Sequence, residues 1–277
     1  MLGVLESEKE MVNITATYVD HCGSDLTTVN AARVSFGKKS QFEGRVGGPN
    51  VLSDRDVKLI KYLAKHGHTS PFGHAFASFH VRCPLFVHSQ LTKHKFLRVN
   101  TVSRRYVDDN IELYEPDQWR SRSVDKKQGS GGAMEISLDS EMLFAATCRN
   151  ALTTYDSMIS EGVAPEQARM ILPQSLFTEF YWSGSLDAFA AMCKLRCASD
   201  TQYETRVVAD QISEKMSKLF PVSWEALTTV EEDDQLKYLT LDTDKLGIWL
   251  IDDLPDGPQQ LGHIPWETIA QVIQNED

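Results

Sequence analysis

The sequence predicts a mixed α/β domain that spans most of the chain and is followed by an acidic C-terminal extension. Three observations lead to this prediction. One run alternates apolar and polar side chains with the period of a strand, several longer runs carry apolar residues at helical spacing, and the composition changes after Trp224. With 277 residues, 42% of them hydrophobic and 24% charged, the chain has the length and composition of a soluble globule of one large or two small domains.

The first half of the chain predicts a capped helix, an alternating strand and a second helix. Ser53 can cap a helix that ends near the turn residue Gly67. Residues 75–83 place small and aromatic apolar side chains on one side and polar ones on the other, which predicts a strand. A proline opens the helix expected over 84–95, and the polar residues 97–104 are expected to form a loop.

The second half begins with a polar, glycine-rich stretch over 120–133, which indicates an exposed excursion and leaves disorder open as an alternative. Ser199 and Gln202 predict a capping box for the last helix. The remaining elements are predicted as a helix over 138–159, a helix opening at Pro165, a strand over 177–182, a helix over 185–195, and a helix that ends near Phe220, where Pro221 stops it.

Beyond Trp224 the chain becomes acidic. Residues 225–277 contain 13 carboxylates and only two lysines, yet they also carry leucines, isoleucines and tryptophans, so they are not a simple disordered tract. We therefore expect a catalytic or binding domain over 1–224 and an appendage over 225–277 that packs on it.

The sequence also bears on the compartment. The start of the chain has no basic segment followed by a long apolar core, and no span approaches the length of a membrane crossing, so a cytoplasmic protein is expected. Five scattered cysteines favour reduced thiols over a disulfide framework. Cys193 and Cys197 are one helical turn apart and are interpreted as packing residues, since no second ligand pair at metal-binding spacing accompanies them; no metal is predicted.

A stretch without carboxylates lies between Asp56 and Asp108. Its 51 residues carry nine lysines and arginines and six of the eight histidines, although the formal net charge of the chain is -11. An acidic protein that keeps every counter-charge out of one stretch is expected to reserve it for an anionic ligand. We call residues 57–107 the cationic window.

The chain lacks the motifs of several common ligand-binding and catalytic sites, so these kinds of site are excluded. The chain has no GxGxxG or GxxxxGK[ST], which would hold a phosphate on a glycine-rich turn. It also lacks GxSxG, and it lacks the His-x-Glu and Pro-Cys-x-x-Cys of zinc deaminases. The anion site must therefore be built from side chains.

The core of the cationic window carries a spaced motif. Lys93, His94 and Lys95 are followed after seven residues by Ser103, which resembles the Arg-His-Arg-x7-Ser signature of the flavin-dependent thymidylate synthases with both arginines replaced by lysine. Further segments resemble this family in the same order, over roughly residues 15–220: Ala31-Ala-Arg-Val-Ser-Phe36, Lys65-His-Gly-His68, Ser70-Pro-Phe72, Gln90, Glu166-x-Ala-Arg169, Leu172-Pro173, Phe180-Tyr-Trp182, Leu195-Arg196 and Gln202-x-Glu204.

This resemblance implies a fold and a reaction. The family fold is a single α/β domain with a mixed sheet flanked by long helices, assembled as a homotetramer whose FAD sites are shared between subunits. The implied reaction methylates dUMP to dTMP, with methylenetetrahydrofolate as carbon donor, FAD as cofactor and NADPH as reductant. Partners other than dUMP, folate, NADPH and further copies of the chain, such as nucleic acid or a membrane, are not expected.

The resemblance also assigns residues to roles. Arg196 is the expected catalytic residue, because a fixed cation beside the uracil polarises the ring and makes C5 a better nucleophile without a protein thiol. The expected FAD-binding residues are His68, Ser70, Lys93, His94 and Lys95. The expected substrate-binding residues are Gln90, Lys93, Thr101, Ser103, Arg104, Arg105, Arg169 and Arg196, whose hydroxyl, amide and guanidinium donors suit a phosphate dianion.

The chain departs from the usual family pattern at several positions. Thr101 stands where glutamate is usual, and the other departures, mostly on the cofactor side, are Ser185, Asp187, Ala191 and Asp200. Structural alternatives stay open for single residues: Ser103 as a loop cap, Arg105 or Arg169 as a surface ion-pair partner, and Arg196 as a cation that complements a helix dipole. Histidines 66, 74 and 80 are interpreted as structural.

Two other functions compete with thymidylate synthesis at this stage. A relative of the same family could transfer the one-carbon unit to another pyrimidine nucleotide, or leave it as a hydroxymethyl group. A non-enzymatic module could use the cationic window to bind a polyanion, with strong salt dependence and no need of FAD.

Overall fold

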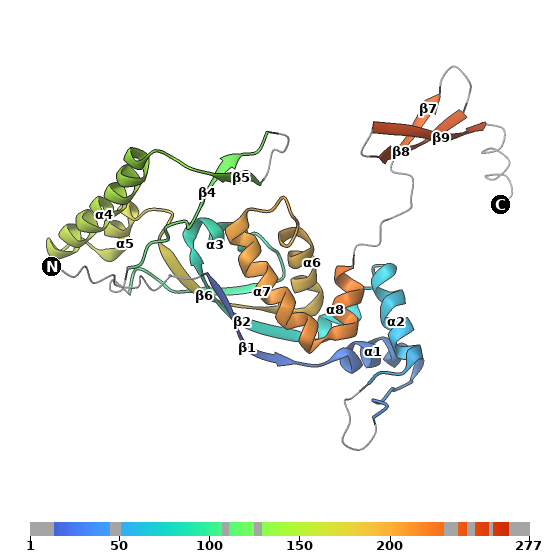
Figure 1. Ribbon diagram of the computed structural model, residues 1–277. Helices are drawn as coiled ribbons and strands as arrows, with labels where there is room; N and C mark the ends of the chain where they lie inside the picture. The colour runs from blue at the N-terminus through green and yellow to red at the C-terminus, as the bar shows by residue number, and fades with distance from the viewer. Residues whose placement is uncertain are drawn as a thin grey trace, which may run out of the picture. The chain divides into compact units, whose positions relative to one another are not determined.

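The structure is a computed structural model that describes residues 14–44, 51–106, 111–124 and 129–229, together with the backbone of three later strands (Figure 1). The chain divides into two compact units, residues 1–228 and 229–277. The N-terminal residues on which the absence of a signal segment was predicted lie outside the described part. Among the described residues, no helix has both the length and the apolar character needed to span a membrane.

A four-stranded sheet with the order β1-β2-β6-β3 forms the centre of the first unit (Figure 1). Its strands are β1 (Thr15–Cys22), β2 (Phe76–Pro84), β6 (Phe177–Ser185) and β3 (Arg98–Thr101). Along β2 the residues Ala77, Phe79, Val81 and Cys83 are buried and their neighbours are partly exposed, so the strand predicted from the alternation is confirmed. Each strand pair in this sheet is antiparallel.

Helices α6 and α7 pack on one face of this sheet, and α3 lies at its end (Figure 1). The core between them contains Phe79, Trp182 and Phe189, whose rings meet edge to face at centroid distances of 5.4 and 5.7 Å. The helices of the unit are α1 (Asp25–Arg33), α2 (Asp54–Lys65), α3 (Leu85–Leu91), α4 (Leu138–Ser160), α5 (Pro165–Ala168), α6 (Leu186–Arg196), α7 (Tyr203–Leu219) and α8 (Pro221–Thr228).

The predicted α/β class is confirmed, with one correction to the sheet. The family resemblance implied a mixed sheet, whereas every ladder among the described residues is antiparallel. The helices predicted over 138–159 and 185–195 and the strand predicted over 177–182 are also confirmed, with small changes at their ends.

The structure also corrects predictions for two segments. Residues 97–104 contain the edge strand β3 and not only a loop, and its side chains are mostly exposed, so it carries no hydrophobic alternation to reveal it. The glycine-rich stretch forms a hairpin of β4 (Trp119–Arg122) and β5 (Ser130–Met134). A Cβ atom on Gly131 would collide with the Ser121 hydroxyl, so glycine permits the close approach of the two strands.

The predicted end of one helix and the predicted cap of another are wrong, whereas the predicted end of α7 near Phe220 is confirmed. Helix α3 ends at Leu91, before the predicted end at 95. The Ser199–Gln202 capping box is not formed, because Gln202 is itself the N-cap of α7 and its side chain makes no capping hydrogen bond. Pro221 does end α7, but it also begins α8, as its fixed φ suits a first helical turn.

A buried carboxylate ties the first two helices together. Asp56 Oδ1 accepts hydrogen bonds from Arg33 Nε and Nη2 at 2.9 and 2.5 Å and from Ser40 Oγ at 2.9 Å, and Oδ2 accepts one from Ser53 Oγ at 2.9 Å. Burial raises the pKa of the Asp56 carboxyl, but the hydrogen bonds from Arg33, Ser53 and Ser40 outweigh it, and the pKa lies below its ordinary value.

We therefore expect Asp56→Asn to destabilise the first unit by about 3 kcal/mol, because it leaves Arg33 partly buried without its counter-ion. Asp54→Asn, on the exposed first turn of the same helix, is the matched control and should cost less than about 1 kcal/mol. Urea unfolding measures both. Because the pKa is lowered on folding, the contribution is present above about pH 4 and is lost as pH falls through the folded value, so the difference between wild type and Asp56→Asn should shrink there. A difference that is constant with pH contradicts this assignment.

The second unit contains an antiparallel sheet of the order β7-β8-β9, with β7 (Tyr238–Asp242), β8 (Gly247–Leu254) and β9 (Gly257–Pro265). The predicted acidic appendage thus has regular secondary structure of its own. Its side chains, and the expected packing of its apolar residues on the first unit, lie outside what the structure describes.

Candidate functional site

The cationic motif of the sequence lies in the loop between α3 and β3. Lys93 and Lys95 are exposed on this loop, and His94 between them is half-buried. Arg196, from the last turn of α6, donates from Nε to His94 Nε2 at 2.9 Å. The fold therefore joins the predicted catalytic residue to a predicted flavin-binding residue 102 positions away in the sequence.

The last two residues of the loop between α3 and β3 fix its conformation. Phe96 has a φ of +69° and is 82% exposed, whereas Leu97 after it is buried against β6. A Cβ atom on Gly184 of β6 would collide with the Leu97 side chain, so this glycine makes room for the loop. The backbone thereby holds the 93–95 segment at the C-terminal end of α6.

The contact with Arg196 requires a neutral imidazole. Arginine has only donors, so His94 Nε2 must accept, and the proton of the neutral ring resides on Nδ1. Burial lowers the pKa of His94, and the Arg196 cation lowers it further. Both causes favour the neutral form that the hydrogen bond needs.

A network of side-chain hydrogen bonds connects α3 to the start of α7. Gln90 Nε2 donates to Gln202 Oε1, and Gln90 Oε1 accepts from Thr205 Oγ1 at 3.1 Å. Gln202 Nε2 in turn donates to Glu204 Oε2 at 3.1 Å. The sequence predicted a ligand-binding role for Gln90, but for Gln202 only a helix cap and a place in a family motif, and for Glu204 only the motif. In the structure, Gln202 and Thr205 fix the Gln90 amide.

The end of β3 supplies a further group of donors. Ser103 Oγ lies 3.4 Å from both the backbone nitrogen and Nε of Arg105, each of which donates to it. Thr101 Oγ1 is 3.0 Å from Nε2 of His88, a residue for which the sequence gave no role. Burial lowers the pKa of His88, which favours its neutral form. Arg104, the next residue after Ser103, is half-buried.

Among the described residues, three predicted site residues make contacts only with near neighbours in the sequence. Arg169 is exposed after α5 and donates from Nε to the Glu166 carbonyl at 3.3 Å. His68 and Ser70 are exposed beyond the end of α2, where the His68 ring lies 6.1 Å from the ring of Tyr62. The structure does not bring these residues to Arg196 within one chain.

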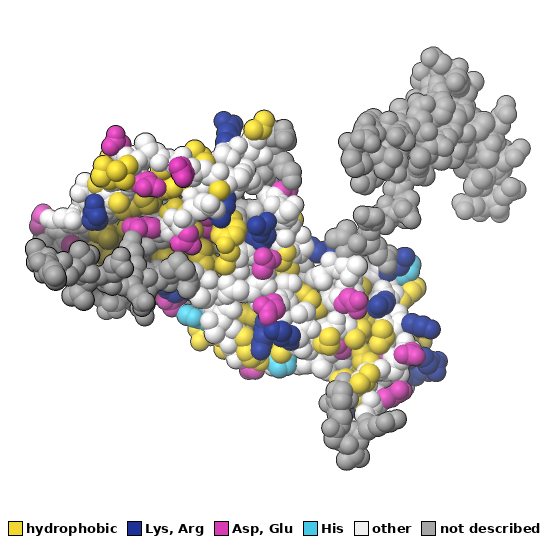
Figure 2. All heavy atoms as spheres, in the orientation of Figure 1, with side chains coloured by type: hydrophobic (Ala, Val, Ile, Leu, Met, Phe, Trp, Pro, Cys, Tyr) yellow, Lys and Arg dark blue, Asp and Glu magenta, His cyan; other side chains and the backbone are white. Residues whose placement is uncertain are grey.

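The cationic window is not one continuous surface. Basic side chains gather over the end of the molecule that carries α2 (Figure 2), where Lys58, Lys61 and Lys65 are exposed. Arg82 has carboxylate partners instead, Glu112 at 2.9 Å and Glu179 at 3.5 Å. Lys61 on α2 also contacts Glu225, at 3.8 Å. Part of the predicted anion site is therefore structural, and its exposed cations lie on more than one segment of the chain.

The donor set of the 93–95 loop fits a dinucleotide cofactor. Two exposed ammonium groups can meet a diphosphate, and the half-buried imidazole between them offers a directional hydrogen bond. Lysine supplies point charges here and lacks the planar fork of arginine.

Comparisons with known proteins show which family the chain belongs to. The family model described as thymidylate synthase complementing protein matches residues 17–222. The flavin-dependent thymidylate synthase of Thermus thermophilus is 39% identical over 210 residues, which are 75% of this chain and 73% of the relative. That of Kosmotoga olearia is 35% identical over 210 residues, 75% and 87% of the two chains. The solved structure of the UMP/dUMP methylase PolB from Streptomyces cacaoi, bound with 5-Br dUMP, has a TM-score of 0.67 at 30% identity and covers 79% of this chain and 96% of its own.

The protein is therefore an enzyme, of the flavin-dependent methyltransferase class, as the motifs predicted. The chain belongs to the flavin-dependent thymidylate synthase family. The alternative of a non-enzymatic polyanion-binding module is set aside by this membership.

Proposed function

We propose that this protein catalyses the reductive methylation of dUMP to dTMP, with methylenetetrahydrofolate as carbon donor, FAD as cofactor and NADPH as reductant. The observation that carries the proposal is the 2.9 Å contact between Arg196 and His94, since it places a fixed, oriented cation beside the loop whose motif defines the family. The names of the relatives, thymidylate synthases and a UMP/dUMP methylase, support dUMP as the substrate.

The chemistry explains why a redox cofactor is needed. A methylene unit replaces the hydrogen on C5 of the uracil and must gain two electrons and a proton to become a methyl group. Lys93, His94 and Lys95, with His68 and Ser70, are the residues that would hold FAD, which in its reduced form would supply these electrons. Arg196 polarises the uracil toward negative charge, and His94 holds the guanidinium so that this charge meets a preorganised donor.

The nucleotide phosphate is proposed to bind at the end of β3 and at Arg169. The Ser103 hydroxyl and the Arg104 backbone amide can donate hydrogen bonds to the phosphate, and Arg105 and Arg169 supply guanidinium groups. The proposed site around the sugar and base is completed by Gln90, Lys93 and Thr101. Residues 1–224 form the proposed catalytic domain and residues 225–277 a C-terminal extension. Because Arg169, His68 and Ser70 lie apart from Arg196 in one chain, we propose a homotetramer in which subunits share each site.

We expect Arg105→Ala to weaken dUMP binding about 10- to 100-fold, because it removes a charge-assisted contact to the phosphate. Arg98→Ala removes an equal charge from exposed β3, three residues before Thr101, and serves as the matched control. Calorimetric titration with dUMP at two salt concentrations measures both. Equal losses in the two variants would show that only the general positive field matters and would refute a directed contact.

A second candidate substrate is UMP. The structural neighbour is named for both UMP and dUMP, and this chain has Thr101, hydrogen-bonded to His88, where the family usually has glutamate. Comparing kcat/KM for dUMP and UMP decides between them. We expect dUMP to be preferred; a higher value for UMP would reassign the substrate while leaving the reaction unchanged.

The test of the cofactor is the absorption spectrum of the purified protein with and without added FAD. A bound flavin should give a yellow protein whose visible band bleaches when NADPH is added. Lys95→Ala should lower the FAD content at equal protein concentration, and Lys58→Ala on α2 is the matched control. A colourless protein that takes up no FAD would refute the proposed cofactor.

A further inference from the structure

A pocket of about 490 Å³ lies beside the proposed nucleotide site and is lined by none of the residues assigned to nucleotide or flavin. Its walls come from α3, the β4–β5 hairpin, α4 and the start of α7. These elements are separated in the sequence and meet in the folded chain. The volume is in the range of small-molecule sites, and larger than a packing defect.

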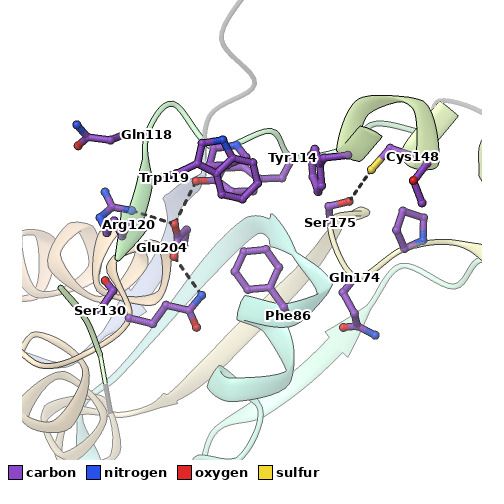
Figure 3. Close-up of a pocket in the computed structure, with 15 residues that line it drawn as sticks. Phe86, Tyr114, Gln118, Trp119, Arg120, Ser130, Cys148, Gln174, Ser175 and Glu204 are labelled. Atoms are coloured by element: carbon purple, nitrogen blue, oxygen red, sulfur yellow. Dashed lines mark hydrogen bonds and ion pairs between the residues drawn. The ribbon is translucent and has the colours of Figure 1, made fainter. Parts of the chain in front are cut away.

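Aromatic rings form the walls of this pocket. Trp119 and Phe144 meet edge to face at a centroid distance of 5.4 Å, and Phe86 and Tyr114 lie 5.9 Å apart. In Figure 3 the rings of Tyr114 and Trp119 overlap and the Phe86 ring lies below them, with Glu204 and Arg120 on one side and Cys148 on the other. Such walls favour a flat ring system, which can stack or meet their edges.

The polar end of the pocket is fixed and oriented. Glu204 is 8% exposed and accepts from Tyr114 Oη and Arg120 Nη1, each at 3.3 Å. Burial, and then the Glu204 charge, raise the pKa of Tyr114, so its hydroxyl stays protonated and donates. Arg120 lies over the Tyr203 ring at 3.9 Å, and its guanidinium carries five N–H donors, of which Nη1 is directed to Glu204. An acceptor on a ligand would meet this cation.

We propose that this pocket binds a planar aromatic molecule that carries an anionic or carbonyl acceptor, with its rings between the two aromatic pairs and its acceptor toward Arg120. The site is separate from the nucleotide site but adjoins it, because Gln202 lines the pocket and is hydrogen-bonded to Gln90. This inference does not depend on the proposed reaction, since binding can be measured without turnover.

The experiment is a fluorescence titration of the full chain with 8-anilinonaphthalene-1-sulfonate, a probe with a flat naphthalene ring system and an anionic sulfonate acceptor. Thr147→Phe fills the pocket from an exposed position of α4, and Ser130→Phe fills it from β5. Thr153→Phe is the matched control: Thr153 is exposed on the same helix, bonds the carbonyl four residues before it as Thr147 does, and does not line the pocket.

We expect saturable binding of one probe per chain, weakened at least about tenfold by Thr147→Phe or Ser130→Phe and unchanged by Thr153→Phe. The neutral analogue N-phenyl-1-naphthylamine should bind less tightly, and dUMP should not displace the sulfonate. Equal binding in all variants, displacement by dUMP or methylenetetrahydrofolate, or tighter binding of the neutral probe would each overturn the proposal. So would loss of oligomers in the filled variants without saturable probe binding in the wild type, since a second copy would then occupy the pocket.

Discussion

Arg196→Lys should lower kcat for dTMP formation about 10²-fold, with a much smaller change in the affinity for dUMP. Lysine keeps the positive charge but has no Nε–H to donate to His94, so the cation loses the orientation that the 2.9 Å contact provides. A preorganised donor acts on the charge that develops in the transition state, and misplacing one typically costs two to three orders of magnitude, that is about 10²–10³ in kcat. Steady-state kinetics at saturating folate and NADPH measure the effect.

Arg149→Lys, on the exposed surface of α4, is the matched control and should leave kcat unchanged. Equal kcat for Arg196→Lys and wild type would contradict the role proposed for Arg196. A rise in KM for dUMP alone would make Arg196 a substrate-binding residue and not a catalytic one.

His94→Leu should reduce kcat nearly as much as Arg196→Lys, whereas His94→Gln should retain most of the activity. The glutamine Oε1 can accept from Arg196 Nε, but leucine offers no acceptor and leaves the guanidinium unpositioned. Both variants lose the imidazole that is also proposed to contact FAD, so the difference between them isolates the acceptor. Flavin content is measured alongside kcat to correct for lost cofactor.

The same contact predicts a pH dependence. Because burial and Arg196 lower the pKa of His94 from its ordinary 6.5, the imidazole is neutral at pH 7 and gains a proton only in more acidic solution. The wild-type kcat should therefore fall in solution more acidic than the ordinary imidazole pKa, as protonated His94 can no longer accept and repels the guanidinium. In His94→Gln this acid limb should disappear. Saturating dUMP removes the contribution of its phosphate, which titrates near pH 6. An unchanged acid limb in His94→Gln would assign the titration to another group.

The elements that could be predicted from sequence are those with a strong period or clear ends. Helix α4 and strand β2 bury one face each, so their patterns survive in the sequence. Strand β3 could not be predicted, because an edge strand with exposed side chains owes its form to pairing with β6. The hairpin at 119–134 could not be predicted, because glycines are also typical of flexible loops. Here they allow β5 to approach β4 closely.

The candidate site could be predicted as a set of residues but not as a geometry. The x7 spacing placed His94 and Ser103 on one segment, and the motif singled out Arg196, yet their contact depends on how α6 packs against the 92–97 loop. The link from Thr101 to His88 was missed because a half-buried histidine on a helix resembles any packing residue. The family motif placed Arg169 in the same predicted set, but the single chain does not bring it to Arg196.

The most direct test of the proposed function is mass spectrometry of the nucleotide product formed from dUMP, NADPH, FAD and methylenetetrahydrofolate labelled with ¹³C in its methylene group. The proposed reaction predicts dTMP that carries the label in its methyl group, formed by the wild type and about 10²-fold more slowly by Arg196→Lys. Labelled hydroxymethyl-dUMP, or unchanged dUMP in the presence of a flavin-loaded protein, would contradict it.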